Sequence, residues 1–249
     1  MTAEKKDVKK LIFGLKPEIP YAIEEAVNRL RINISFLGSD VKKIMIVSSE
    51  PNEGKSFVAL NLWRQMARAG EKTVYLDADM RNSTFAKKYK ISNEDGSELK
   101  GTSHYLSSNI GLDEVLRAND LNAGHLIPNV DNIINPSMLL ENVKFEEMLD
   151  ELAEEYRYVF VDAPPLGLVS DAERIGNLCD GAILCVRAGF TSKGAVKEAI
   201  SQLERAGCPL LGIVLNRVGA SKGGYYHKYY SKYYYGHKYY GYGQSAKEK

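Results

Sequence analysis

The stretch IMIVSSEPNEGKS, residues 44–56, joins an apolar, largely β-branched run to the start of a helical pattern. Its last residues have the chemistry of a P-loop. Gly54 allows the backbone to approach a phosphate, Lys55 can reach the β- and γ-phosphates, and Ser56 places a hydroxyl for Mg²⁺ at the helix N-terminus. Ser49 stands where the first glycine of GxxxxGK[ST] usually lies, so the motif is a variant. The stretch predicts a strand, a phosphate-binding turn and a helix.

Two acidic motifs follow other apolar runs. YLDAD places Asp77 and Asp79 at the end of one predicted strand, and FVDAPP places Asp162 at the end of another. In an open parallel sheet, ligands lie at the carboxyl ends of the strands. A buried carboxylate is unfavourable there unless it is paired or binds a metal ion. Together with GKS, the three aspartates predict a nucleotide site with a bound cation.

Strands and helices alternate along most of the chain. Apolar residues at helical spacing predict helices over 21–36, 55–69, 136–156 and 196–208, and short β-branched runs predict strands within 42–50, 72–79, 156–165, 181–189 and 209–218. Residues 81–123 have no clear pattern, apart from a polar loop at 93–103 that we expect to be exposed. This order predicts an α/β fold of the P-loop NTPase type, with a mostly parallel, twisted sheet covered by helices on both faces.

The ends of the chain differ from its centre. Residues 1–19 form a polar, lysine-rich arm, and residues 20–218 contain all the predicted strands and helices. Residues 219–249 contain no Val, Ile, Leu, Met or Phe, yet they hold ten of the sixteen tyrosines. Such a segment buries too little aliphatic surface to offset its ordering entropy. We therefore predict a P-loop domain with an N-terminal arm and a flexible, tyrosine-rich C-terminal tail.

Composition excludes several classes of protein. The net charge of +1, from 33 basic and 32 acidic residues, provides no overall field that would select nucleic acid or a membrane. Three cysteines without a CxxC motif indicate reduced, buried thiols. The sequence has no signal peptide and no apolar run long enough to span a bilayer, so we expect a cytoplasmic protein. HRDxxxxN, DFG and VAIK are absent, which excludes a kinase of the eukaryotic fold, and GxSxG is absent too.

With these motifs in place, the chain resembles the bacterial tyrosine kinases of capsule and exopolysaccharide synthesis, in their cytoplasmic Gram-positive (CpsD/CapB-like) form. EEAVNRLRINISF at 24–36 is similar to the family's EAxRxLRTNIxF helix, and SEPNEGKS at 49–56 to its Walker A loop. VYLDADMR at 74–81 is similar to its second motif, A′, and VFVDAPP at 159–165 to its Walker B motif. Related positioning ATPases carry a lysine where this chain has Glu50.

The resemblance implies a protein-tyrosine kinase that uses ATP and Mg²⁺. Lys55, Asp77, Asp79 and Arg81 would be catalytic, with Asp77 or Asp79 accepting the tyrosine proton and Arg81 stabilising charge. The residues implied to bind ATP are Glu53, Gly54, Lys55, Ser56, Phe57, Asn216 and Arg217. The residues implied to hold Mg²⁺ are Ser56, Asp79 and Asp162.

The resemblance also assigns a role to the tail, as a cluster phosphorylated by a neighbouring subunit. The implied phosphoacceptors are Tyr225, Tyr226, Tyr229, Tyr230, Tyr233, Tyr234, Tyr235, Tyr239, Tyr240 and Tyr242. Oligomerisation into a ring, for which an octamer is one option, would use Glu25, Arg29 and Arg31 of the 21–36 helix. Asn28 replaces the middle arginine of the family's ExxRxxR motif, which leaves the strength and geometry of assembly open.

The implied partners are a transmembrane activator of the polysaccharide co-polymerase type, which would hold the kinase at the inner face of the membrane, and a tyrosine phosphatase that acts on the tail. No nucleic-acid partner is expected. Two other readings remain. The chain could be a P-loop ATPase that switches assembly without kinase activity. The tail could be a solvated low-complexity end, or a platform on which single-stranded nucleic acid stacks.

Overall fold

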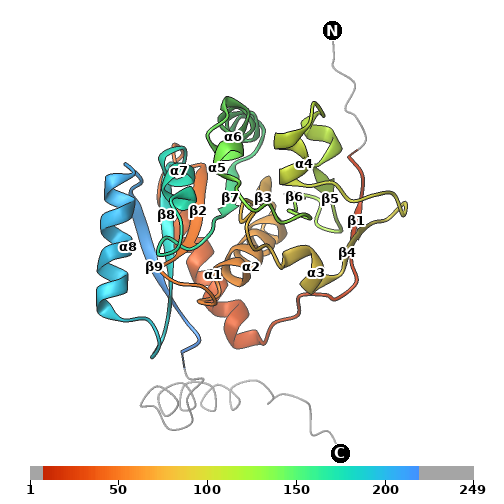
Figure 1. Ribbon diagram of the computed structural model, residues 1–249. Coiled ribbons are helices and arrows are strands. Elements are labelled where there is room, and N and C mark those ends of the chain that lie inside the picture. The colour runs from red at the N-terminus through yellow and green to blue at the C-terminus, as the bar shows by residue number, and fades with distance from the viewer. Residues whose placement is uncertain (1–7, 219–249) are drawn as a thin grey trace, which may run out of the picture.

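The computed structural model describes residues 8–218. The tyrosine-rich tail and its predicted phosphoacceptors lie outside the described residues. A seven-stranded sheet crosses the centre in the order β5-β6-β3-β7-β2-β8-β9 (Figure 1). Its strands are β2 (Lys43–Ser48), β3 (Thr73–Asp77), β5 (Arg117–Ala118), β6 (Gly124–Ile127), β7 (Tyr158–Asp162), β8 (Gly181–Arg187) and β9 (Leu210–Asn216). All neighbours pair in parallel except β5, which runs antiparallel to β6, so the predicted fold class is confirmed.

Helices cover both faces of the sheet (Figure 1). On one face lie α1 (Tyr21–Ser35), α2 (Lys55–Arg68) and α3 (Phe85–Tyr89). The other face is covered by α4 (Thr102–Ser107), α5 (Ser137–Leu140), α6 (Val143–Glu155), α7 (Asp171–Asn177) and α8 (Lys193–Arg205), and a short 3-10 helix, η1, spans Leu112–Glu114. Within residues 8–218, no helix is both long enough and apolar enough to cross a membrane.

The strand β2 shows why both faces need a cover. Its residues alternate between two hydrophobic cores: Ile44 and Ile46 pack on the α2 side, and Met45 and Val47 on the α6 side. All four are fully buried. A strand buried on both faces is a continuous apolar run and not an alternating one. This is the pattern from which the sequence predicts a central parallel strand.

The N-terminal arm contributes a strand that the sequence pattern did not predict. β1 (Leu11–Phe13) pairs antiparallel with β4 (Ile91–Asn93) beside the main sheet. Leu11 is buried, and the Phe13 ring makes edge contacts with Phe85 and Tyr89. Residues 8–19 are therefore attached to the domain through a small aromatic cluster.

The prediction of one helix over 136–156 was wrong. The chain forms α5, leaves the helix at Glu141, and starts α6 after Asn142. The Asn142 side chain accepts a hydrogen bond from the Lys144 amide at 2.9 Å, which caps the new helix. A good capping residue therefore divides a segment whose apolar spacing fits a single helix.

The loop at 93–103 is exposed at Glu94 to Gly96 and at Glu98, but Asn93 and residues 101–103 are buried, so this prediction was wrong at both ends. Asn93 is buried and accepts a hydrogen bond from Arg117 Nε at 2.8 Å. Thr102 is buried too, and its hydroxyl donates to the carbonyl oxygen of Asp77 at 2.7 Å. Each end is polar because it binds a buried polar group of the domain.

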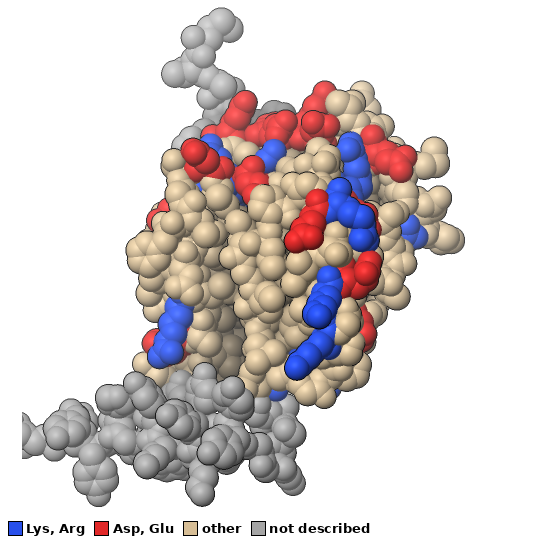
Figure 2. All heavy atoms as spheres, turned by 90° about the vertical axis from the view of Figure 1, so that its left-hand side faces the viewer, with Lys and Arg blue, Asp and Glu red and all other residues tan. Residues whose placement is uncertain are grey.

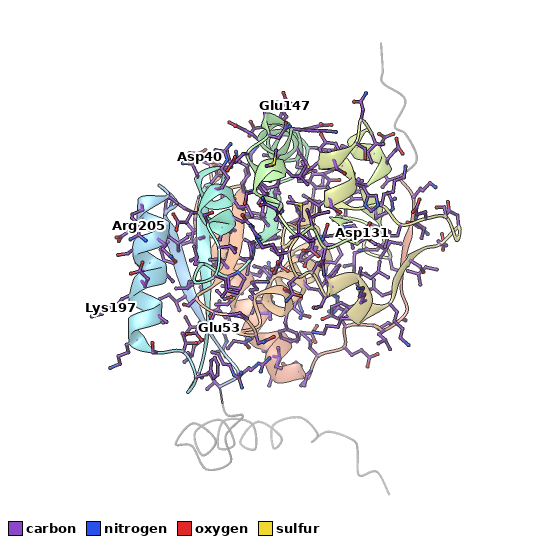
Figure 3. All side chains as sticks on the ribbon, in the orientation of Figure 1. Asp40, Glu53, Asp131, Glu147, Lys197 and Arg205 are labelled. Carbon is purple, nitrogen blue, oxygen red and sulfur yellow. The ribbon has the colours of Figure 1, made fainter. Side chains whose placement is uncertain are left out.

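The far end of the sheet is formed by the edge strand β9 and by α8. Figure 2 shows this side of the molecule, where lysines and arginines lie beside aspartates and glutamates. On α8, Lys197 and Arg205 point away from the sheet (Figure 3). On the edge strand β9, Ile213 and Leu215 are about half exposed.

Candidate active site

The P-loop connects β2 to α2 at the carboxyl edge of the sheet. Gly54 has φ +96°, a left-handed conformation that glycine adopts without a steric penalty, and α2 begins at the next residue, Lys55. Asn52, at φ +62°, is also left-handed. The Ser48 hydroxyl donates to the carbonyl oxygen of Glu50 at 2.8 Å and closes the first turn of the loop. The local sequence therefore bends the backbone tightly around the N-terminus of α2.

The buried side chain of Glu53 anchors the P-loop through hydrogen bonds. Its carboxylate is fully buried and accepts hydrogen bonds from the Glu50 amide at 2.9 Å, the Arg187 amide at 3.4 Å and the Thr191 hydroxyl. Figure 3 labels Glu53 near the carboxyl ends of the strands. The sequence predicts that Glu53 binds ATP, but its side chain contacts the turn between β8 and α8. A contribution to nucleotide binding would come from its backbone.

Lys55 lies between two of the three predicted aspartates. Its Nζ is 2.7 Å from Asp79 Oδ2 and 3.8 Å from Asp162 Oδ1. The Lys55 and Asp79 side chains are only 12% and 9% exposed, so this ion pair is largely removed from water. Burial lowers the pKa of Lys55, but the charges of Asp162 and Asp79 outweigh it and hold this pKa above its ordinary value. The lysine is therefore charged and offsets part of the negative charge of the cluster.

Asp77 is buried behind this pair. Its carboxylate accepts hydrogen bonds from the Ser83 hydroxyl at 2.5 Å, the Asp79 amide at 3.2 Å and the Asn129 amide at 3.4 Å. Burial and the charge of Asp162 raise the pKa of Asp77 to about 8. Unlike Asp79, it accepts these bonds from neutral donors.

Asp162, at the end of β7, has one hydrogen-bonded oxygen and one that is approached only by Lys55, at 3.8 Å. Its Oδ2 accepts a hydrogen bond from the Tyr75 hydroxyl at 2.8 Å, whereas its buried Oδ1 has no hydrogen-bond partner. Burial raises the pKa of Asp162, while Lys55, Ser56 and Tyr75 lower it. Burial and the charges of Asp162 and Asp77 also raise the pKa of Tyr75. A buried carboxylate oxygen without a donor is the kind of atom that a cation can satisfy.

These residues fit Mg²⁺ bound together with phosphates. Mg²⁺ takes oxygen ligands and is usually held by one or two carboxylates plus substrate phosphates and water. Asp162 supplies the open oxygen, and Ser56 and Asp79 stand beside it at the same cavity. Within residues 8–218, no group of three or more His, Cys, Asp or Glu side chains forms a ready-made metal site. The arrangement therefore suits a cation that arrives with its nucleotide.

The predicted residues meet in one cavity of about 1180 Å³ at the carboxyl edge of the sheet. Its lining includes Gly54, Lys55, Ser56, Phe57, Asp77, Asp79, Arg81, Asp162, Asn216 and Arg217. Asn216 Nδ2 donates to the carbonyl oxygen of Glu53 at 2.8 Å, which joins the end of β9 to the P-loop. Of the residues predicted to be catalytic or to bind ATP or Mg²⁺, Glu53 alone is absent from this lining. The α1 residue Arg29, predicted for oligomerisation, also lies at the cavity.

Arg81 is held by a partner that the sequence pattern did not reveal. Its Nε and Nη2 donate to the two oxygens of Asp171 at 2.5 and 3.1 Å. Nη2 also donates to the Ser137 hydroxyl at 3.1 Å. Asp171 is buried at the start of α7. The predicted role of Arg81 in charge stabilisation stays a prediction, since its guanidinium binds Asp171 here.

On α1, the predicted oligomerisation residues lie along one helix. Arg29 is exposed, whereas Glu25 and Arg31 are partly buried. Arg31 Nε donates to Asn28 Oδ1 at 2.9 Å. The guanidinium that the predicted interface would use is therefore already hydrogen-bonded within α1. The role of these residues in self-assembly stays a prediction.

Comparisons with known proteins place the chain in a family. The profile of a family described as an AAA domain matches residues 41–199. Tyrosine-protein kinase CpsD of Streptococcus agalactiae serotype III is 37% identical over 198 residues, which cover 80% of this chain and 84% of that protein. Putative tyrosine-protein kinase CapB of Staphylococcus aureus is 31% identical over 235 residues, covering 93% and 100%.

A solved structure agrees with these relatives. The crystal structure of the chimerical protein CapA2B2 superposes with a TM-score of 0.72, at 30% identity, over 82% of this chain and 87% of that one. The sequence similarity therefore extends to the arrangement of strands and helices around the P-loop. The chain belongs to the CpsD and CapB family of bacterial tyrosine-protein kinases.

Proposed function

We propose that this kinase transfers the γ-phosphoryl group of ATP to tyrosine hydroxyls in its own segment 225–242, with a neighbouring subunit of an oligomer as the acceptor. The observation that carries the proposal is the position of Lys55, 2.7 Å from Asp79 and 3.8 Å from the open oxygen of Asp162, at the N-terminus of α2. The names of the related tyrosine-protein kinases support the choice of tyrosine as substrate.

The chain would bind ATP with the P-loop and the end of β9. Backbone amides at the N-terminus of α2 and the Lys55 ammonium attract the β- and γ-phosphates, and Lys55 would exchange its contact with Asp79 for the phosphates. Ser56, Asp79 and Asp162 would hold Mg²⁺, which supplies charge neutralisation of the phosphates when bound. Asn216 and Arg217 lie at the same cavity and would contact the base.

The transfer forms a bond between the tyrosine oxygen and the γ-phosphorus and breaks the bond from that phosphorus to the β,γ-bridging oxygen. The tyrosine hydroxyl must lose its proton to a base as it attacks, since its ordinary pKa is near 10. Asp79 is engaged by the Lys55 ammonium at 2.7 Å. Asp77 accepts hydrogen bonds from neutral donors, so we assign the proton to Asp77 and phosphate-side contacts to Asp79.

The C-terminal segment suits an acceptor in a neighbouring subunit. It begins directly after β9, whose last residue, Asn216, lies at the cavity. Tethering in an oligomer raises the effective concentration of such a segment to roughly the millimolar range. Each phosphate adds a charge of about −1.5 to −2, so accumulating phosphates would repel one another and loosen the assembly.

In the cell, the kinase would act in capsule or exopolysaccharide synthesis and control polymerisation and export. A transmembrane activator of the polysaccharide co-polymerase type would bring it to the inner face of the membrane. A tyrosine phosphatase would reset the tail. The names CpsD and CapB of its relatives support this setting.

The test uses two lysine variants of the full chain. Purified wild type, Lys55→Met and Lys72→Met are incubated with Mg·ATP, and the C-terminal peptides are analysed by mass spectrometry. Lys72 is the matched control, because it is half exposed and pairs with Glu155 at 2.7 Å on the surface. Phosphotyrosine in wild type and Lys72→Met, and none in Lys55→Met, is the expected result.

A mixing experiment tests transfer between subunits. Lys55→Met supplies intact tails, and a wild-type chain truncated after Val218 supplies active sites. Phosphotyrosine on the Lys55→Met tail is expected. Steady phosphate release without any phosphotyrosine, including in the presence of a membrane activator, would instead identify an ATPase that switches assembly.

A further inference from the structure

Asp162, the aspartate of the FVDAPP motif, has a buried hydrogen-bond partner on the neighbouring strand β3. The Tyr75 hydroxyl in β3 donates a hydrogen bond to Asp162 Oδ2 in β7 over 2.8 Å. Tyr75 and Asp162 are both almost fully buried. A buried tyrosine brings into the strand a hydroxyl that needs a hydrogen-bond partner.

Strand pairing brings the hydroxyl to that carboxylate. β3 and β7 run parallel, with Tyr75 opposite Phe160 and Asp77 opposite Asp162. Tyr75 and Phe160 lie in the core on the α2 side of the sheet, the side on which Lys55 begins α2. Asp162 is two residues beyond Phe160, so its side chain points to the same face. The Tyr75 ring leans toward the carboxyl edge and reaches Asp162 from within the core.

The ring itself has little freedom to move. Its centroid lies 4.8 Å from that of Phe85 and 6.4 Å from that of Trp63. Both of these neighbours are buried as well. The hydroxyl therefore occupies a fixed position between the sheet and α2.

The two oxygens of Asp162 are consequently unequal. Oδ2 is held by the Tyr75 hydroxyl, and the buried Oδ1 has no hydrogen-bond partner and lies 3.8 Å from Lys55 Nζ. A neutral donor orients a carboxylate without cancelling its charge, whereas a lysine in the same place would compete with a cation. The arrangement keeps one charged oxygen open toward the phosphate site.

We propose that Tyr75 is a positioning residue, which orients Asp162 so that Oδ1 is presented to the Mg²⁺ that accompanies the nucleotide. The inference rests on the proposed function in one respect, that Asp162 is a ligand of this cation. It gives a role to the tyrosine that begins the YLDAD motif, a residue that acts through Asp162 without contacting the nucleotide. Loss of such an outer partner typically weakens metal binding by about 10- to 100-fold.

The test measures how strongly Mg²⁺ improves nucleotide binding at equilibrium. A fluorescent ADP analogue is titrated into the full-length chain in EDTA and at a series of MgCl₂ concentrations, for wild type and Tyr75→Phe. We expect an affinity for Mg²⁺ about 10-fold lower in Tyr75→Phe. The affinity for the analogue in EDTA should stay unchanged, because the P-loop and Lys55 are intact.

Tyr156→Phe is the matched control. Tyr156 is also a buried tyrosine beside β7, but its hydroxyl has no hydrogen-bond partner, and it precedes the amino end of the strand. The Tyr156→Phe protein should bind Mg²⁺ and the ADP analogue with wild-type affinity. Circular dichroism melting of all variants verifies that the fold is retained.

The Asp162→Asn variant and the double variant Tyr75→Phe/Asp162→Asn separate the possible outcomes. If Tyr75 acts through Asp162, the double variant is no worse in Mg²⁺ affinity than Asp162→Asn alone. A Tyr75→Phe protein with wild-type Mg²⁺ affinity, next to a weakened Asp162→Asn, overturns the inference and leaves the proposed function standing. Absence of any Mg²⁺ effect in wild type would overturn both.

Discussion

The side-chain amide of Asn216, the last residue of β9, donates a hydrogen bond to the carbonyl oxygen of Glu53 over 2.8 Å. The P-loop is thereby attached to the final strand, directly before Gly54. The Glu53 carboxylate accepts hydrogen bonds from the amide of Arg187, the last residue of β8, and from the hydroxyl of Thr191, which follows β8. The loop is therefore held on one side by two strand ends before any nucleotide binds, which reduces the ordering that binding requires.

This attachment predicts a severe effect of Gly54→Ala. The residue has φ +96°, and a Cβ at this position would overlap the Asn216 amide. The left-handed backbone alone costs a residue with a Cβ about 1–2 kcal/mol. We expect loss of nucleotide binding, measured with a fluorescent ADP analogue, together with a lower free energy of unfolding in urea.

Gly70→Ala is the control for backbone strain. Gly70, just after α2, has φ +87°, and a Cβ there would meet no atom within 4 Å. It should lower the free energy of unfolding by about 1 kcal/mol and leave nucleotide affinity unchanged. Equal nucleotide affinities in the two variants would contradict the importance of the Asn216 contact.

A second prediction concerns the stability of the nucleotide-free protein. Lys55→Met leaves Asp77, Asp79 and Asp162 buried without their cation. Removing one partner of a buried ion pair typically costs about 3 kcal/mol or more. Urea unfolding at pH 7.5 should show a loss of this size.

The double variant Lys55→Met/Asp79→Asn distinguishes charge from packing. It removes one of the carboxylates that Lys55 neutralises, so it should recover part of the lost stability but no kinase activity. If the double variant is as unstable as Lys55→Met alone, the loss is due to packing of the lysine stem and not to uncompensated charge.

The central strands and the P-loop were predictable because their signals are local. A β-branched run followed by GKS, and apolar runs that end in Asp77 and Asp162, carry their own burial pattern in the sequence. Parallel pairing then necessarily brings the carboxyl ends to one edge. The meeting of Lys55 with both acidic motifs in one cavity follows from that topology.

The remaining features depend on contacts between distant segments. β6 is only four residues long, and β1 is three, so neither run is long enough to show a period. Asp171 and Tyr75 acquire their roles from Arg81 and Asp162, which are far away in sequence. A buried polar residue in an apolar strand, such as Tyr75, is the one signal that could have indicated such a partner.

A third prediction separates the two aspartates of the second motif. Asp77→Asn should lower the rate of tyrosine phosphorylation by about 100-fold or more while nucleotide affinity is retained, as expected for loss of a general base. Asp79→Asn should weaken binding of the Mg²⁺–nucleotide complex, since we propose that Asp79 helps to hold Mg²⁺. Single-turnover phosphorylation and equilibrium binding measure the two effects. The reverse pattern would move the base to Asp79.

A fourth prediction concerns stability at low pH and a histidine far from the P-loop. His125 in β6 lies against the Tyr156 ring, and its buried Nδ1 has no hydrogen-bond partner. Burial lowers the pKa of His125 below 6.5, with the charge of Glu155 opposing and that of Lys72 reinforcing the shift. The unfolded chain therefore takes up this proton more readily than the folded one, so folding stability falls as pH drops below 6.5.

His125→Leu should remove that part of the acid destabilisation. The free energy of unfolding is measured in urea between pH 5 and pH 7.5, where wild type should lose more stability than the variant. His104→Leu serves as control, because His104 is 25% exposed and lies 3.3 Å from Asp131. An identical pH dependence in wild type and His125→Leu would refute the assignment.

The last prediction uses the departure of this chain from the family's helix motif. Asn28 accepts a hydrogen bond from Arg31 Nε at 2.9 Å and so engages a side chain that we expect to contact a neighbouring subunit. Asn28→Ala should free Arg31, and Asn28→Arg should also restore the missing cation of ExxRxxR. Sedimentation velocity with Mg·ADP should show tighter self-association in the order wild type, Asn28→Ala, Asn28→Arg. Glu25→Lys, which reverses the complementary charge, should abolish it. If all four proteins sediment alike, α1 is not the assembly surface of this kinase.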